Sequence, residues 1–144
     1  MRVNVTVDDS SAQRLLKGMQ RRSTNFGPVF KEARKMLEQA NRENFTSNGL
    51  PVGGWKPHEE PEGWPMLRRS GKLFNSLANL RGSPNDIGLR SAIFGTKVEY
   101  AKFHQNGTED LPKRLIVFEP VGFKLRLGEK AADHIIGRRA EMLP

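Results

Sequence analysis

The chain has 144 residues, which is the size of one domain and enough to bury one hydrophobic core. It has no cysteine, which excludes a disulfide framework, a catalytic thiolate and a zinc ribbon. Lys and Arg outnumber Asp and Glu by 24 to 16, and the charge of +8 favours acidic partners such as nucleic acid or an acidic protein face. No apolar run approaches the roughly 20 residues that cross a bilayer. We therefore expect a soluble, unprocessed single domain over residues 1–144, with no membrane partner.

Two elements are expected before the first break in the chain. Residues 3–7 alternate valine with polar residues, which predicts a short strand with its three valines facing inward. From about residue 12 to residue 22 a narrow apolar stripe runs among basic residues and predicts a short helix. Asp9 or Ser10 is expected to cap the first turn of this helix.

The strongest periodic pattern lies between residues 28 and 45. Apolar residues recur there at spacings of three and four, and Pro28 stands at an opening position where its missing N–H costs nothing, so we predict a long helix. Residues 46–65 then hold four prolines, four glycines and both tryptophans and show no sustained period. A loop of this length is either disordered or used for binding, and its tryptophans favour binding. The simpler interpretation is that Trp55 pins the loop to the core.

The remaining elements are short, and each is marked by a period or by a breaker residue. In chain order they are a helical segment over 66–80 with a short helix capped by Ser70, a strand over 87–95, a helix over 98–105 ended by Gly107, a strand over 114–119 and a helix from about Gly128. Together the elements predict an α+β fold. The long N-terminal helix would pack on a small, mainly antiparallel sheet of strands near 2–7, 87–95 and 114–119. The Pro-, Gly- and Trp-rich loop would project toward a neighbouring subunit.

The stretch from Gly95 to Arg114 collects side chains that look chemical, above all His104. A helical zinc site needs a second histidine one turn away, and His104 has none. No nucleophile motif surrounds Ser70, and the glycine pair at 53–54 lacks the Lys-Ser/Thr of a phosphate loop. We therefore expect no catalytic, metal or cofactor site and interpret His104 as a structural or contact residue.

Three segments in a fixed order resemble those of one family. Residues 67–76 match LxxSGxLxxS, residues 95–107 hold GT followed by YAxxHQxG, and residues 112–114 match PxR. Before them, a loop with Gly, Pro and Trp55 follows the long helix. Over about residues 45–118 the chain resembles the virion morphogenesis and tail completion proteins of tailed phages.

The resemblance implies a structural protein without enzymatic activity or cofactor. Such proteins act at the head–tail junction or the tail end of the virion, as a ring that completes the tail or neck and supports head–tail joining. The implied partners are further copies of the chain, the neck or connector proteins and the tail tube proteins, with non-specific contact to genomic DNA in the channel. Before assembly the protein would lie in the cytoplasm of the bacterial host.

The residue types of these motifs suit contacts better than catalysis. Tyr100 and His104 lie four apart, so they share one face of the predicted helix and each combine apolar contact with a hydrogen bond. That face could meet either the chain's own core or the next subunit. The candidate interface and motif residues are Trp55, Arg68, Arg69, Ser70, Gly71, Gly95, Tyr100, His104, Gln105, Gly107, Pro112 and Arg114.

Two other functions stay open from the sequence. The charge also suits a basic nucleic-acid-binding module, although no helix-turn-helix glycine pattern, zinc knuckle or aromatic-rich RNA-binding strand occurs. A tail terminator ring that controls tail length is the second. A small hydrolase that uses His104 would account for that residue alone.

Overall fold

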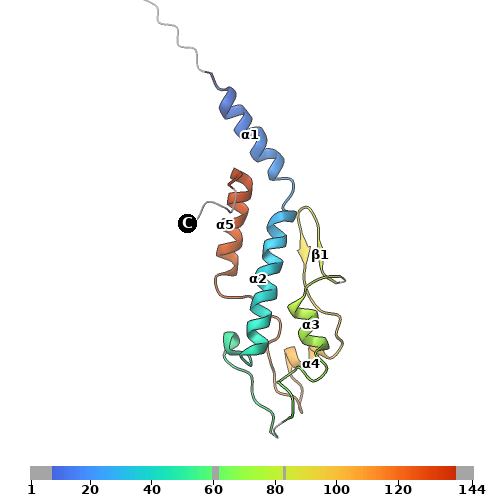
Figure 1. Cartoon of the computed structure of the whole chain (residues 1–144). Coiled ribbons are helices and arrows are strands. Elements are labelled where there is room, and N and C mark those ends of the chain that lie inside the picture. Colours follow the sequence, from blue (N-terminus) through green and yellow to red (C-terminus); the bar gives the residue numbers. More distant parts are fainter. Residues whose placement is uncertain (1–7, 60–61, 83, 139–144) are drawn as a thin grey trace, which may run out of the picture.

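The computed structural model describes residues 8–59, 62–82 and 84–138, and these residues form an α+β fold (Figure 1). Its elements in chain order are helix α1 (Ser10–Arg22), helix α2 (Gly27–Thr46), the 3-10 turn η1 (Leu50–Val52), helix α3 (Lys72–Ala78), strand β1 (Asp86–Ile87), strand β2 (Ala92–Ile93), helix α4 (Ala101–Asn106) and helix α5 (Phe123–Ile136). The α+β class predicted from the sequence is confirmed.

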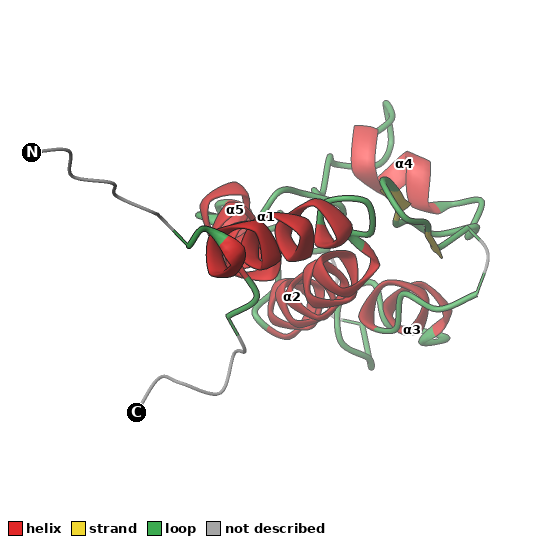
Figure 2. Ribbon diagram, turned by 90° about the horizontal axis from the view of Figure 1, so that it is seen from above, coloured by secondary structure: helices red, strands yellow, loops and turns green. Residues whose placement is uncertain are grey.

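Helix α2 is the centre of the molecule, with α5 on one side and α3 on the other (Figures 1 and 2). Pro28 occupies its first turn, as predicted, and the 20-residue helix confirms the long element expected there. Its buried face combines apolar Val29, Ala33 and Phe45 with the amides of Asn41 and Asn44. A helix that buries asparagine needs partners for those amides. Both amide nitrogens donate to carbonyls of other segments, whereas Asn44 Oδ1 is buried without a partner among the described residues.

The core lies around the C-terminal half of α2. Phe45 is 1% exposed and meets Trp55 edge-on, with ring centroids 5.2 Å apart. The buried members of this cluster are Phe45, Trp55, Leu73, Leu77, Leu80, Val98, Ala101 and Ile116. Full burial of a side chain such as Ile116 contributes about 1.5–3 kcal/mol. The core therefore ties α2, α3, α4 and the loops around them into one packed body.

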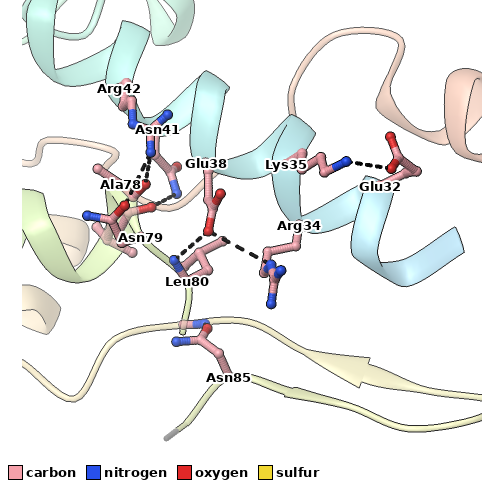
Figure 3. A network of polar contacts seen from close by, with 12 residues as sticks. Glu32, Arg34, Lys35, Glu38, Asn41, Arg42, Ala78, Asn79, Leu80 and Asn85 are labelled. Atoms are coloured by element: carbon pink, nitrogen blue, oxygen red, sulfur yellow. Dashed lines mark hydrogen bonds and ion pairs between the residues drawn. The ribbon is translucent and has the colours of Figure 1, made fainter. Parts of the chain in front are cut away.

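Polar side chains of α2 satisfy the backbone at the end of α3 (Figure 3). The Asn41 amide donates to the Leu77 carbonyl at 2.9 Å, and the Arg42 guanidinium donates to the Ala78 carbonyl at 2.7 Å. Glu38 accepts the Leu80 N–H at 2.9 Å. The last carbonyls of a helix have no partner inside it, so these bonds complete α3 and fix its distance from α2.

The predicted sheet is corrected in two places. The segment predicted as one strand over 87–95 folds back on itself: β1 and β2 pair antiparallel, Asp86 opposite Ile93, through a turn in which the Gly88 N–H donates to the Ser91 carbonyl at 2.8 Å. The strand predicted over 114–119 is wrong, because that segment has no strand partner, bends at Val117 and bonds instead with the side chain of Gln105. The strand predicted over 2–7 lies outside the described residues.

These differences change what the long helix packs on. Helix α2 packs chiefly against α3 and α5 and touches the small sheet through β1. At its N-terminal end, the Phe26 N–H donates to the Leu89 carbonyl at 2.7 Å, which holds the hairpin turn against the start of α2.

Helix α1 stands out beyond the rest of the molecule, and its C-terminal end meets the end of α5 (Figure 1). Arg22 donates to the carbonyls of Ile135 and Ile136 at 2.8 and 3.1 Å, and His134 Nε2 lies 2.6 Å from the Asn25 carbonyl. Basic groups at the C-terminus of a helix satisfy its free carbonyls and oppose its dipole. The α1–α5 contact is thus made mainly by end groups.

The ends of these two helices differ from the predicted ones. No side chain caps the first turn of α1 in the predicted way; Asp8 accepts the Ser10 N–H at 3.0 Å, and Asp9 instead bonds the Gln13 amide at 2.9 Å. Helix α5 begins at Phe123, and the Gly128 expected to open it lies in its interior.

Candidate interface site

The side chain of Gln105 in α4 bonds with the backbone of residues 116 and 117. Its Oε1 accepts the N–H groups of Ile116 and Val117, each at 2.9 Å, and its Nε2 donates to the Val117 carbonyl at 2.8 Å. The carbonyl of His104, the residue before Gln105, accepts the Arg114 N–H at 2.7 Å. The PxR segment is therefore fastened to α4 by backbone-directed bonds, and Gln105 is a structural member of the motif.

Arg114 is buried, at 1% exposure, and its guanidinium forks onto one carbonyl. Nε and Nη2 donate to the Lys56 carbonyl at 3.1 and 2.9 Å. The third nitrogen, Nη1, is buried without an acceptor among the described residues, and no carboxylate there lies within ion-pair distance. Burial lowers the pKa of Arg114 and the charge of Glu62 opposes this, but a guanidinium stays protonated in proteins. The motif thus carries a buried positive charge.

Trp55 pins its loop to the same segment, which agrees with the simpler of the two interpretations of this residue. It is 6% exposed, and its Nε1 donates to the Leu115 carbonyl at 3.0 Å; Asn44 donates to that carbonyl at 2.9 Å. Gly49 lies under the indole ring at φ +81°, where an added Cβ would sit 2.3 Å from Trp55. The Gly and Trp of this loop therefore form one packing unit.

A hydroxyl pair joins the first motif to the second. Ser76 Oγ lies 2.7 Å from Thr96 Oγ1, which also accepts the Val98 N–H at 3.1 Å. The Gly95 N–H donates to Asn85 Oδ1 at 2.8 Å and so positions the start of the second motif. These contacts bring positions 20 residues apart in the chain to one place.

The other glycines and the proline of the motifs shape the backbone. Gly71, at φ +69°, is the N-cap of α3 in place of the predicted Ser70, whose hydroxyl accepts the Lys72 N–H at 3.4 Å. Gly107 ends α4 at φ +76°, and an added Cβ would sit 3.0 Å from the Lys113 nitrogen. Pro112 is half-buried in the turn that follows. Positive φ favours glycine, so these positions are explained by local geometry.

Four of the candidate interface and motif residues line one cavity of about 340 Å³. Arg69 and Ser70 come from the first motif, and Tyr100 and His104 from the second, with ring centroids of the last two 6.1 Å apart in an edge-on arrangement. The loop before α3 supplies the remaining walls, which are His58, Glu62, Trp64 and Leu67. The cavity is therefore where the two motifs and the loop converge.

The residues around this cavity are not all equally exposed. Tyr100 and Trp64 are each 38% exposed, so Tyr100 faces the cavity and solvent instead of the core. Arg69 lies over the Trp64 ring at 5.0 Å, whereas Arg68 lies over the Phe74 ring at 4.1 Å and is not a lining residue. Of the two adjacent arginines, Arg69 is thus the one available to a ligand in the cavity.

Burial and nearby positive charge both act on His104. Its pKa is lowered, first by burial and then by the charges of Arg114 and His58. Its Nδ1 is buried without a hydrogen-bond partner among the described residues. The only carboxylate of the lining, Glu62, lies 3.5 Å from His58. A neutral imidazole flanked by positive groups disfavours a cation there and favours an anion.

Sequence reasoning named the motif residues but missed several of their partners. Asn44, Glu38 and Asn41 read as members of a polar helix face, and their buried amide and carboxylate contacts cross to α3 and to the PxR segment. His58 and Glu62 lie in a loop without a hydrophobic period, so no residue spacing predicted that these two side chains line the cavity. The local motif of Gly, Pro and Trp was the one available signal.

The described residues contain neither a metal-binding cluster nor a membrane-spanning helix. No group of three or more His, Cys, Asp and Glu side chains converges there to hold a metal ion. Over the same ranges, no helix is both long enough and apolar enough to cross a membrane.

The fold and the converging motifs define a scaffold for contacts. The family model described as the phage virion morphogenesis family matches residues 7–133, and the chain belongs to this family. It is therefore a phage structural protein associated with the virion and its morphogenesis. No curated protein and no solved structure matches the chain at a significant level.

Proposed function

We propose that this protein completes the tail or neck of the virion and supports head–tail joining, and that it does so as a homo-oligomeric ring. Family membership supports a role in morphogenesis. The observation that carries the finer proposal is a set of large apolar side chains on α1, on α5 and before α5 that the single chain leaves uncovered.

Neither α1 nor α5 contains a buried residue. Leu15 and Leu16 on α1 are 53% and 62% exposed, and Leu125 on α5 is 70% exposed. Val121 just before α5 is 93% exposed, and Ile136 at its end is 44% exposed. Large apolar side chains left exposed along helices suit an interaction surface. A ring needs two different complementary faces on each subunit, and a projecting α1 supplies one of them.

The positive charge of α1 supports the proposed contacts with other virion proteins and with DNA. Helix α1 carries Arg14, Lys17, Arg21 and Arg22 and no acidic residue between positions 10 and 22. A basic helix of this kind suits acidic faces of neck, connector or tail tube proteins, and it also suits non-specific contact with genomic DNA in a channel. We place the protein at the head–tail junction or the tail end on these grounds.

The mass of the purified full-length protein tests the ring. We expect a closed oligomer by native mass spectrometry and light scattering, and a shift toward monomer for the double variant Leu16→Ser, Leu125→Ser. The matched control is Leu89→Ser, because Leu89 is also 62% exposed but lies in the hairpin turn. A wild-type protein that stays monomeric at all concentrations and never joins particles would rule out the ring.

The same material separates the proposal from a nucleic-acid-binding module. If the monomer bound duplex DNA with a steep salt dependence and the double serine variant bound it equally well, the DNA-binding alternative would be favoured over assembly.

A further inference from the structure

The cavity between the loop before α3 and helix α4 has a chemistry that ring formation through α1 and α5 does not use. Its walls are part apolar, from Trp64 and Leu67, and part hydrogen-bonding, from Ser70, Tyr100 and Arg69. A volume of about 340 Å³ lies at the small end of the range of ligand sites and suits one or two side chains. The cavity is thus sized for a group that enters from outside.

The charges around the cavity are unbalanced toward the positive. Arg69 has no ion pair with a carboxylate among the described residues, and Glu62 faces His58 instead. Behind the wall, Arg114 is buried next to His104 with one nitrogen unpartnered in the same ranges. A buried charge without a counter-charge is costly, and an anion arriving nearby would reduce that cost.

Arg69 is positioned to contact such an anion. Its guanidinium stacks over Trp64 at 5.0 Å, which leaves the N–H edge free to fork onto a carboxylate. The Tyr100 ring, fixed edge-on against His104, brings a hydroxyl to the same cavity.

We propose that this cavity binds the side-chain carboxylate of an acidic protein segment, with Arg69 as its charged contact and Ser70 and Tyr100 as hydrogen-bond donors. The apolar walls favour a protein side chain over a DNA phosphate, because the methylenes of Asp or Glu can pack on Trp64 and Leu67 whereas a phosphodiester brings two sugars that the cavity does not hold. The site goes beyond the proposed ring, and its response to a peptide is measured separately from ring formation.

Two sources can supply this carboxylate. One is a neighbouring copy: the turn in which the Thr108 N–H donates to the Leu111 carbonyl at 2.8 Å presents the exposed Glu109 and Asp110 at its tip. Neither of these acids has an ion pair in the part of the chain that the structure describes. The other source is an acidic segment of another virion protein.

Imidazole NMR of the full-length protein tests the site, because the chain has only three histidines. The probe is the peptide acetyl-Ala-Glu-Glu-Ala-amide, compared with its Gln-Gln counterpart and with a short DNA duplex. We expect the Glu peptide alone to shift the His104 resonances and to raise the His104 pKa by about one unit, the effect of an opposite charge within a few ångströms.

Two arginine variants locate the contact. Arg69→Gln should weaken the peptide response about tenfold or more, as expected for loss of a forked charged contact. Arg90→Gln, at an exposed arginine of the hairpin turn, should leave the response unchanged. Equal responses to the Glu and Gln peptides, equal effects of the two arginine variants, or a response to DNA alone would each overturn the proposal.

Two more measurements separate the sources and the proposals. If neighbouring copies supply the carboxylate, the double variant Glu109→Gln, Asp110→Asn should lower the His104 pKa in the assembled protein; if another protein supplies it, that pKa stays unchanged. Arg69→Gln should leave the mass of the oligomer unchanged. The double variant Leu16→Ser, Leu125→Ser should lower the mass of the oligomer and keep the peptide response. Failure of the ring and failure of the cavity are therefore distinguishable.

Discussion

Gln105 bonds with the backbone of Val117 through both polar atoms of its side-chain amide: Oε1 accepts the Val117 N–H at 2.9 Å, and Nε2 donates to the Val117 carbonyl at 2.8 Å. Because Gln105 also accepts the Ile116 N–H, one side chain of α4 satisfies three backbone groups of this segment.

Gln105→Ala should therefore destabilise the protein by about 2–3 kcal/mol, because it removes three hydrogen bonds and leaves the partly buried Ile116 N–H without an acceptor. Gln105→Glu keeps the acceptors but sets a carboxylate against the Val117 carbonyl, and we expect an intermediate loss. Urea unfolding at constant protein concentration measures both.

The control for this pair is Gln39→Ala. Gln39 is an exposed glutamine of α2 whose amide contacts Glu43 alone, so its loss should cost less than about 0.5 kcal/mol. Equal effects of the substitutions at positions 39 and 105 would contradict a clamping role for Gln105.

Gly49 and Gly53 separate two reasons for glycine in the loop before Trp55. Both have positive φ, +81° and +94°, but an added Cβ meets Trp55 at 2.3 Å from Gly49 and meets nothing within 4 Å from Gly53. Gly53→Ala should cost about 1–2 kcal/mol for the left-handed backbone alone. Gly49→Ala should add about 1–3 kcal/mol for overpacking against the indole. Thermal unfolding of the two variants measures the difference, and equal melting temperatures would show that Trp55 moves aside freely.

The elements predicted correctly are those whose signal is local. Helix α2 combines a period of three and four with Pro28 in its first turn, and both signals act within a few residues. The segment 114–119 was predicted as a strand around the apolar run of residues 115–118, but an apolar run does not say what the backbone bonds with. Here the partners are the side chains of Gln105, Trp55 and Asn44, up to 71 residues away.

The candidate site shows the same limit. The spacing of the motifs picked out Arg69, Ser70, Tyr100 and His104, and all four line one cavity. The loop wall with His58 and Glu62 could not be predicted, because nothing periodic places a Pro- and Gly-rich loop against a helix some 40 residues on. The motif therefore located half of the cavity, and packing supplied the rest.

The charge of Arg114, behind the cavity, contributes to the lowered pKa of His104. Burial is the largest cause of the lowered His104 pKa, and the Arg114 charge is the next. Arg114→Met removes that charge at similar length, so the His104 pKa should rise toward its ordinary value of 6.5. Arg114→Lys keeps a charge in place and should leave the pKa lowered, although it loses the forked contact with the Lys56 carbonyl. Imidazole NMR measures both, and a rise of equal size in the two variants would remove Arg114 as an electrostatic cause.

The lowered pKa of His104 also predicts how stability depends on pH. The folded state favours the neutral imidazole, so the folded chain holds fewer protons than the unfolded chain between the two pKa values. The contribution of His104 is therefore fully present above the unfolded value of about 6.5 and is lost as pH falls through the lower folded value. The difference in unfolding free energy between wild type and His104→Gln should be most favourable to wild type near pH 8 and should shrink toward pH 5. Chemical unfolding at matched protein concentration gives this difference at each pH, and other groups cancel between the two chains. A difference that stays flat would show that folding leaves the His104 pKa unchanged, and one that grows on acidification would show that His104 is charged and paired in the folded protein.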